Sequence, residues 1–449
     1  MELKDLGPKI AELESSINID KRMYDEDIEA QLAHVTMLGQ CGIIDKTEAD
    51  KICGELEKIQ KEFSYGNFNF DTKYRNINEF IKAELFKRLG DLGNKALLAR
   101  HYDDQIALDL RLNLKKEADI MVLKLKELIN AICYKAVEHT KTIMPGYAHL
   151  QAIQPTTFAH HIMAYAEMFL RDIERLNDSK KRMEEMPLGS GILSTTSYPI
   201  NRSVTTLLLG LEKMTNNSVD AVSDRDFCVE MASCLSIIML HLSRFCEEII
   251  LLSSSRFRFI ELDDNFSYSS NILHQRKSPN VAERIRGKSG RVFGNLVSIL
   301  TSLKALPLSH SDDMKETEES LFDSIDTVAL CVDIFTPMIS SMKVNEDIMK
   351  DAAKKSFVNM QDCADYLIKR GTSQRDAYMI VSHLVNYCME NNCTLEELPL
   401  EKYKQASSKF EDDILDAISL ENCIEERNTF SGPAEFNVLQ QIKRVKSLI

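Results

Sequence analysis

Apolar residues recur at the three- and four-residue spacing of an α-helix along most of the chain, and glycine and proline rarely interrupt them. The longest uninterrupted stretch, residues 103–144, ends at Pro145-Gly146 and predicts a helix on the order of 60 Å long. Further long helices are predicted at residues 156–186, 216–264, 289–303 and 316–336, the last closed by Pro337. Helices of this length must pack along one another, so the pattern indicates an all-α protein with packing between chains.

The two ends of the chain carry shorter helical patterns that are separated by turns. Near the N-terminus, residues 25–38 and 77–89 are amphipathic, and an aromatic, turn-rich link lies between them at residues 63–70. Near the C-terminus, short helices are predicted at residues 364–368, 375–390 and 395–404. The long-helix region therefore has a mixed helical segment before it and a small helical segment after it.

Composition and charge narrow the function class. The 449 residues are 44% hydrophobic and 28% charged, which is typical of a soluble globular protein, and the net charge of −14 argues against a nucleic-acid or anionic-membrane partner. No apolar run approaches the roughly twenty residues of a membrane span, and residues 1–19 lack the apolar core of a signal peptide. The eleven cysteines have no CxxC pair and no zinc-type histidine spacing, so we expect a cytoplasmic protein without a metal.

Residues 266–290, FSYSSNILHQRKSPNVAERIRGKSG, separate two of the long helical patterns. Small residues, amides and the adjacent cations Arg276 and Lys277 suit a loop that closes over an anionic ligand. On composition alone, a solvated loop between helices is the better interpretation.

This loop resembles an altered copy of the signature GSSxMPxKxNP of the fumarase/aspartase superfamily. Within that superfamily the chain resembles argininosuccinate lyases, most clearly at residues 144–176, 187–202, 217–227, 241–267 and 285–296. The resemblance implies a three-domain, mostly helical subunit, with domains at residues 1–100, 101–344 and 345–449. It also implies that the central long helices form a twenty-helix core in a homotetramer, and that each active site collects residues from three chains.

The function implied by the resemblance is that of a carbon–nitrogen lyase in amino-acid metabolism, namely arginine biosynthesis. Such an enzyme acts on a small molecule and needs no cofactor. A base removes a Cβ proton from an N-succinyl amino compound, the amine leaves, and fumarate is released. This β-elimination requires an activated serine, cations and amide donors around the substrate carboxylates, and a loop that excludes water.

Three residues align with the catalytic positions of the family. Ser270 aligns with the base, although a loop serine is more often a simple turn residue. His149, in GYAHLQ, and Glu283 align with a supporting histidine–carboxylate pair. An isolated histidine at a helix end would normally be a packed or capping residue, but one half of a retained pair is expected at the site.

Gln105, Arg225 and Lys277 match substrate-binding positions of the family. Arg225 is explained equally well as a structural ion-pair partner of Asp224 or Asp226. The remaining expected substrate-binding residues differ from those of the family, and they are Tyr102, Asp103, Arg276, His310, Lys315, Gln31 and Asn78. Ala148, Ser278, His274 and Glu318 also depart from the family pattern, Glu318 standing in place of a lysine.

The departures cluster at ligand-binding positions, whereas the helix faces match the family. Tyr102 and Asp103 replace Arg-Asn, which removes a cation and adds an anion where a substrate carboxylate should lie. At about 4 Å in a partly buried site, such a reversal changes carboxylate binding by several kcal/mol. One explanation is a lyase retuned to a substrate other than argininosuccinate, in which Asp103 binds a cationic group. The other is a catalytically degenerate homologue that acts as a binding, regulatory or structural oligomer.

Overall fold

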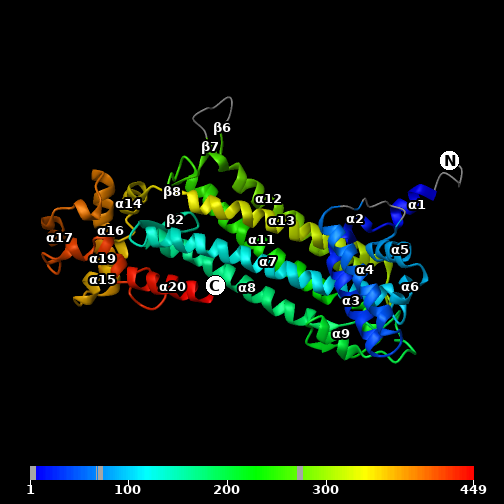
Figure 1. The fold of residues 1–449 in the computed structure, drawn as a ribbon. Coiled ribbons are helices and arrows are strands. Elements are labelled where there is room, and N and C mark those ends of the chain that lie inside the picture. Colours follow the sequence, from blue (N-terminus) through cyan, green and yellow to red (C-terminus); the bar gives the residue numbers. More distant parts are fainter. Residues whose placement is uncertain (1–6, 67, 69–73, 270–276) are drawn as a thin grey trace. The chain divides into compact units, whose positions relative to one another are not determined.

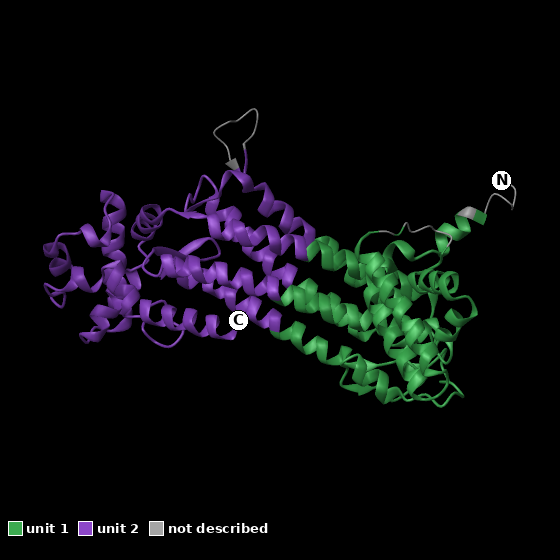
Figure 2. Ribbon diagram, viewed as in Figure 1, with its two compact units in different colours: residues 1–122, 174–237, 290–328 green, residues 123–173, 238–289, 329–449 purple. Residues whose placement is uncertain are grey.

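The computed structural model describes residues 7–66, 68, 74–269 and 277–449, and most of these residues are helical (Figure 1). Every sheet among the described residues has two strands only. The prediction of an all-α fold is therefore confirmed. The chain divides into two compact units (Figure 2): unit 1 holds residues 1–122, 174–237 and 290–328, and unit 2 holds residues 123–173, 238–289 and 329–449. The division into three domains stays a prediction.

The long helices are α7 (Tyr102–Glu138), α8 (Phe158–Met183), α11 (Asp226–Ser253), α12 (Asn280–Leu303) and α13 (Lys315–Ser341). The single helix predicted over 216–264 is wrong, because α10 (Ser218–Ser223) ends at Asp224, whose backbone is extended, and α11 begins afterwards. The predicted stop at Pro337 is also wrong. A proline removes one backbone hydrogen bond of a helix, and here the next two residues, Met338 and Ile339, are fully buried and hold the final turn in place.

A β-hairpin occupies the region where the sequence suggested only the end of one helix and the start of the next. Strands β1 (Ile143–Ala148) and β2 (Gln151–Thr157) pair antiparallel, with Pro145 opposite Pro155. The turn between them consists of His149 and Leu150, both with positive φ, as in the tight turns that favour hairpins. Prolines in both strands and a turn without glycine or asparagine conceal this hairpin in the sequence. His149 is therefore a turn residue, and the interpretation of a helix end is wrong.

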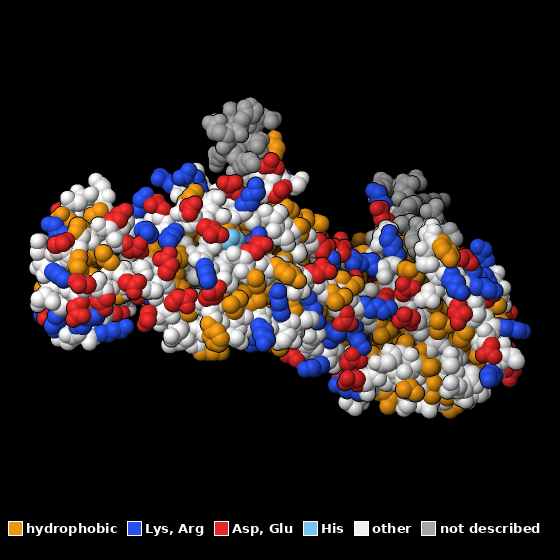
Figure 3. All heavy atoms as spheres, turned by 60° about the vertical axis from the view of Figure 1, so that its left-hand side comes forward, with side chains coloured by type: hydrophobic (Ala, Val, Ile, Leu, Met, Phe, Trp, Pro, Cys, Tyr) orange, Lys and Arg blue, Asp and Glu red, His pale blue; other side chains and the backbone are white. Residues whose placement is uncertain are grey.

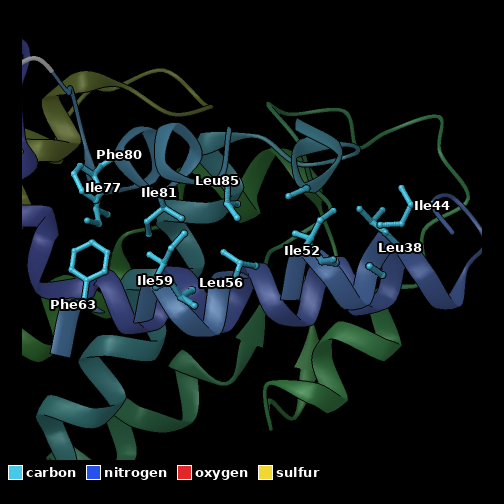
Figure 4. Close-up of a cluster of buried hydrophobic side chains, with 14 of the residues drawn as sticks. Leu38, Ile44, Ile52, Leu56, Ile59, Phe63, Ile77, Phe80, Ile81 and Leu85 are labelled. Carbon is cyan, nitrogen blue, oxygen red and sulfur yellow. The ribbon is translucent and has the colours of Figure 1, made fainter. Parts of the chain in front are cut away.

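The N-terminal part of unit 1 is a packed group of helices. Its elements are α1 (Gly7–Glu14), α2 (Ile17–Asp20), η2 (Lys21–Met23), α3 (Tyr24–Gln40), α4 (Lys46–Ser64), α5 (Ile77–Leu89), α6 (Asp91–Asn94) and η3 (Lys95–Leu97). Figure 4 shows Leu56, Ile59 and Phe63 of α4 facing Ile81 and Leu85 of α5 across a buried apolar layer. The predicted helices at 25–38 and 77–89 are confirmed as α3 and α5. Helix α4, which contributes one side of this layer, is absent from the sequence-based assignment.

Unit 1 is completed by short elements that connect the long helices. These are β3 (Glu185–Met186), α9 (Arg202–Leu208), β4 (Lys213–Met214) and η5 (Asp312–Met314), with β3 and β4 pairing in parallel. They bring the segments before α11 and α13 to the start of α7, where the candidate site lies.

The C-terminal part of unit 2 contains the short helices that were predicted there. Its elements are α14 (Glu346–Lys355), α15 (Met360–Lys369), α16 (Gln374–Asn391), η6 (Leu395–Glu397), α17 (Leu400–Ala406), α18 (Ile414–Ala417), α19 (Leu420–Glu425) and α20 (Glu435–Leu448). The helix predicted at 395–404 is split at Pro399, because the residue before a proline favours an extended backbone and Leu398 adopts one. Unit 2 also contains β5 (Ile260–Glu261), η4 (Asp264–Phe266), β6 (Tyr268–Ser269), β7 (Lys277–Ser278) and β8 (Lys343–Val344).

Candidate active site

The beginning of α7 gathers most of the expected substrate-binding residues of unit 1. The helix starts at Tyr102, and Asp104 in its first turn accepts the backbone N–H of His101 at 3.0 Å, which caps the helix. The same carboxylate accepts the backbone N–H groups of Gly189 at 2.9 Å and Gly191 at 2.8 Å. Asp104 thus ties the loop before α9 to the start of α7. Burial raises the pKa of Asp104 to about 6 despite these three hydrogen bonds.

Gln31, Asn78 and Gln105 meet around the buried side chain and backbone of Asp27. The Asp27 carboxylate accepts hydrogen bonds from Gln31 Nε2 and from Asn78 Nδ2, the latter at 3.0 Å. Gln105 Nε2 donates to Asp109 Oδ1 at 2.7 Å and contacts the Asp27 carbonyl oxygen at 3.5 Å. These three amides are brought together as predicted neighbours, and their donor groups already bind protein carboxyl and carbonyl oxygens.

This amide layer also contains the buried ionisable side chains of Arg100 and Asp109. Arg100 Nη1 donates to Gln105 Oε1 at 2.9 Å, and the charges of Asp27, Asp104 and Asp109 support the guanidinium. Burial nevertheless lowers the pKa of Arg100. Burial, and next the charge of Asp27, raise the pKa of Asp109 well above its usual value. The layer forms a rigid polar wall behind the first turns of α7.

Arg225 lies between α10 and α11, with only 2% of its surface exposed. Its Nη1 donates to the backbone oxygens of Asp224 at 2.7 Å and Val222 at 3.4 Å, while Nε and Nη2 have no partner among the described residues. The Asp224 carboxylate instead pairs with Arg111 Nη2 at 2.5 Å. No ion pair joins Arg225 to Asp224 or Asp226 in the described part of the chain, so the structural interpretation of Arg225 finds no support in these contacts.

Tyr102 and His310 pack edge to face, with ring centroids 5.8 Å apart. Burial, and next the charges of Asp20 and Glu318, raise the pKa of Tyr102 well above its usual value. Burial, and next the charge of Arg225, lower the pKa of His310. Both side chains are therefore neutral hydrogen-bonding groups near pH 7. Asp103, the next residue after Tyr102, is buried and lies with one carboxylate oxygen 3.4 Å from His101 Nδ1.

Several buried polar atoms of this region have no hydrogen-bond partner among the described residues. They are Tyr102 Oη, Arg225 Nε and Nη2, both ring nitrogens of His310, Asp20 Oδ1 and both carboxylate oxygens of Glu318. We call these five residues the polar cluster. Native proteins pair almost all buried polar groups, so a cluster of open donors and acceptors indicates a place where a ligand or water completes the hydrogen bonds.

Lys315 stands at the edge of the polar cluster. Its ammonium group pairs with Asp312 at 3.0 Å, and its charge acts on Asp20, Glu318 and His310. It also lines a cavity of about 480 Å³ together with Ser16, whose hydroxyl donates to Asp20 Oδ2 at 2.6 Å. This cavity therefore reaches the residues that flank the polar cluster.

The expected catalytic residues belong to unit 2 or lie outside the described residues. His149 is exposed in the β1–β2 turn and Glu283 is exposed in the first turn of α12, and the structure describes no hydrogen bond or ion pair between them. Ser270 and Arg276 fall outside the described residues, as does the side chain of Lys277. The backbone of Lys277 in β7 pairs with Ser269 in β6, which brings the two ends of the signature loop together.

Sequence analysis did not single out Asp20, Arg100, Asp104 or Asp109. On α7 a signal was present for Asp109 alone, because it interrupts the apolar residues 106–110, whereas Asp104 lies in a polar triplet. Asp20 has no such signal, since Lys21 and Arg22 follow it directly and its partner Glu318 is remote in the sequence. Residues 7–66, 68, 74–269 and 277–449 hold no group of three or more His, Cys, Asp or Glu side chains that could bind a metal ion. Within the same ranges no helix is long and apolar enough to cross a membrane.

Comparison with known proteins first gives the class. Residues 7–294 match the family model described as Lyase, and residues 357–425 match the one described as Argininosuccinate lyase C-terminal. A crystal structure of EDDS lyase in complex with formate superposes with a TM-score of 0.84, covering 95% of this chain and 86% of that chain at 26% identity. The fold is therefore that of a lyase of the fumarase/aspartase superfamily, as predicted.

The relatives in sequence then give the family. The argininosuccinate lyase of Clostridium perfringens is 47% identical over 435 residues, which are 97% of this chain and 93% of that protein. The argininosuccinate lyase of Desulforamulus reducens is 47% identical over 437 residues, covering 97% and 95%. The chain belongs to the argininosuccinate lyase family, and it is a carbon–nitrogen lyase.

Proposed function

We propose that this protein catalyses β-elimination of an N-succinyl amino compound of the argininosuccinate type and releases fumarate. The observation that carries the proposal is the polar cluster, whose donors and acceptors are buried and open. Each unsatisfied buried polar group costs about 1–3 kcal/mol, so a cluster without a ligand would be selected against. Membership of a carbon–nitrogen lyase family makes a substrate the natural ligand.

Arg225 is the residue best suited to hold a substrate carboxylate. Its open Nε and Nη2 form the side of a guanidinium that binds both oxygens of a carboxylate at once. Tyr102 and His310 add neutral hydrogen-bonding groups beside it. These groups would stabilise the negative charge that develops on the substrate when the Cβ proton is removed. Asp103 is a candidate partner for a cationic amino or guanidino group of the substrate.

Ser270 is proposed as the base that removes the Cβ proton, with His149 and Glu283 as a supporting pair and Arg276 and Lys277 as cations of the closing loop. His149 and Glu283 are both exposed, and no hydrogen bond or ion pair of either side chain is found among the described residues. We therefore infer that they meet across subunits, in an active site that collects residues from more than one chain.

A homotetramer is supported by apolar side chains that remain exposed on the long helices. Figure 3 shows orange apolar side chains scattered among charges of both signs on one face of the molecule. On α12, Phe293, Val297 and Leu300 recur at helical spacing, and Val297 is 61% exposed. A second chain would cover such a stripe. Light scattering of the purified protein tests this assembly, and a monomeric mass would contradict it.

We also assign the protein to the cytoplasm, because its cysteines form no disulfide in the part of the chain that is described. Measuring the number of thiols that react in the denatured, unreduced protein tests this assignment. Eleven reactive thiols would support it, and fewer would contradict it.

The test of activity is the ultraviolet absorbance of fumarate's conjugated double bond. Argininosuccinate is offered first, followed by adenylosuccinate, aspartate and other N-succinyl amino compounds. Fumarate from argininosuccinate would show that Tyr102 and Asp103 are compatible with that substrate, whereas fumarate from another compound alone would establish a retuned lyase. No fumarate from any of them, with the tetramer intact, would contradict the proposal and favour a binding, regulatory or structural oligomer.

The role of Ser270 is tested by replacing it with alanine. The Ser270→Ala variant should lose turnover and keep the tetramer, because the hydroxyl is needed only for proton removal. Ser269→Ala, one residue earlier, is the matched control and should retain turnover. Activity that survives in Ser270→Ala would remove this serine from the role of base.

A further inference from the structure

Two acidic residues of the polar cluster, Asp20 and Glu318, have no role in the elimination proposed above. Asp20 ends α2 and is 0% exposed, and Glu318 lies in the first turn of α13 and is 1% exposed. Their carboxyl groups lie within hydrogen-bonding reach of each other. Asp20 Oδ2 accepts from Ser16, and apart from the contact between the two carboxyl groups themselves, Asp20 Oδ1 and the Glu318 oxygens have no donor among the described residues.

Two buried carboxyl groups in contact do not both ionise, because each negative charge opposes the other. Burial raises the pKa of Asp20 to about 6, and burial together with the charge of Asp20 raises the pKa of Glu318 well above its usual value. Near pH 7 the pair therefore shares one proton and carries one negative charge.

Charged and titratable groups face this pair from every element around it. Lys315 and Arg225 stabilise the ionised form, and Asp27 on α3 opposes it at Asp20. Tyr102 and His310, both neutral, complete the surroundings. Arg225 is 2% exposed, its charge acts on Glu318, and its Nε and Nη2 have no partner among the described residues, so a second set of open hydrogen-bonding groups lies near the acidic pair.

A purely structural acid pair would be expected to have donors for its remaining oxygens, because unpaired buried carboxylate oxygens are costly. We propose that Asp20 and Glu318 recognise a cationic group, an ammonium or a guanidinium, on the amine that leaves the substrate. The pair thereby selects among N-succinyl amino compounds. When the cation binds, the shared proton passes to solvent and both carboxylates accept hydrogen bonds from the ligand. This inference rests on the proposed function for the identity of the ligand.

The cavity beside Ser16 and Lys315 provides the space next to the pair. Its wall is polar and contains charges of both signs, from residues such as Glu14, Arg75 and Glu319. A charged amine would keep polar contacts as it passes this wall. The Ser16 hydroxyl, which now donates to Asp20, lies between the cavity and the pair.

Calorimetric binding of leaving amines to the intact tetramer tests the inference without turnover. Arginine, citrulline, which lacks the guanidinium, and N-acetylarginine, which lacks the free ammonium, are titrated in two buffers of different ionisation enthalpy. We expect binding of the recognised cation to release up to about one proton per site near pH 7. Weaker binding of citrulline than of arginine would identify the guanidinium as the recognised cation. Weaker binding of N-acetylarginine would identify the ammonium. Equal affinities with no proton released would overturn the inference.

Substitution of the pair gives the second arm of the test. Glu318→Gln keeps the shape of the side chain and removes its charge, so affinity for the recognised cation should fall about ten- to a hundredfold and proton release should disappear. Asp20→Asn should do the same from the other side of the pair. The control is Glu57→Gln, an exposed glutamate of α4, which should bind as the unmodified protein does. Unchanged affinity and proton release in both pair variants would overturn the assignment.

The failure of this inference is distinguishable from failure of the proposed function. Absence of fumarate with intact, proton-linked cation binding would reject the elimination and keep the pair as a cation site. If fumarate is released without a preference for substrates that carry a cationic amine, and Glu318→Gln releases it in the same way, the elimination is kept. The role of the acidic pair in recognising a cation is then rejected.

Discussion

Replacing Arg111 with leucine should destabilise unit 1 by about 2–3 kcal/mol. Arg111 is 1% exposed and makes three contacts: Nη1 donates to the Ala107 carbonyl at 3.0 Å, Nη2 pairs with Asp224 at 2.5 Å, and the guanidinium lies 4.2 Å from the centroid of the Phe227 ring. These contacts join α7 to the segment that carries Arg225.

The magnitude follows from what each contact contributes. A hydrogen bond to a charged partner contributes about 1.5–3 kcal/mol, and a buried cation over an aromatic ring up to about 2 kcal/mol. Burial lowers the pKa of Arg111, which shows that desolvation opposes these gains. Asp224 keeps a side-chain exposure of 23%, so water partly replaces the lost partner, and the cost falls below the roughly 3–5 kcal/mol of a fully buried pair.

A double-mutant cycle separates the ion pair from the loss of packing. Urea unfolding is followed by far-ultraviolet circular dichroism for Arg111→Leu, Asp224→Asn and the double variant, and we expect a coupling energy of about 2 kcal/mol. Arg291→Leu, which removes an arginine that pairs with Asp323 at the surface, is the control and should change stability much less. A coupling energy below about 0.5 kcal/mol would refute the reasoning, because the pair would then contribute no more than an exposed one.

Two further predictions concern buried groups whose pKa values change on folding. Burial raises the pKa of Asp104 to about 6. Its contribution to the free energy of unfolding is therefore fully present below its unfolded pKa of about 4 and is lost as pH rises to about 6. Asp104→Asn should make the free energy of unfolding depend less on pH over this window. Burial lowers the pKa of His34 to about 3, so its contribution to the free energy of unfolding is present above pH 6.5 and is lost as pH falls toward 3. In His34→Gln the side chain can still donate to the Leu98 carbonyl, and this variant should lose less stability in acid. Chemical denaturation at a series of pH values measures both, and slopes identical to those of the unmodified protein would contradict them.

The long helices could be predicted from sequence because a buried helix face requires apolar residues at fixed spacing. Their ends were less predictable. Pro337 lies inside α13, where burial of the next turn outweighs one lost hydrogen bond, and the β1–β2 hairpin contains prolines in both strands. In each case packing between distant segments overrides a local preference, and a single sequence does not display that packing.

The candidate site shows the same limit at the level of single side chains. Resemblance to a family identified Tyr102, Arg225 and His310 as neighbours, and the described contacts bring these three together. The residue type alone left two interpretations of Arg225, and only the contact of Asp224 with Arg111 separates them. Glu318 appeared in the sequence as the loss of a lysine. The structure places Glu318 against Asp20, both buried, and this contact is the basis for proposing a cation site there. The contact depends on how α2 and α13 pack, which the sequence does not display.

The charges around the polar cluster support a site that accepts a cation in place of a proton. When Asp20 and Glu318 share one proton, the pair carries one negative charge, Asp103 and Asp312 add two more, and Arg225 and Lys315 carry two positive charges. Charges of both signs therefore lie close together, which limits the cost of burying them. Exchange of the shared proton for a ligand cation leaves this balance unchanged. A ligand without a cation would instead have to bind beside the protonated pair, or beside two carboxylates that repel each other. A cationic ligand releases the shared proton, whereas a ligand that leaves the pair protonated does not, and the calorimetric measurement of proton release distinguishes the two.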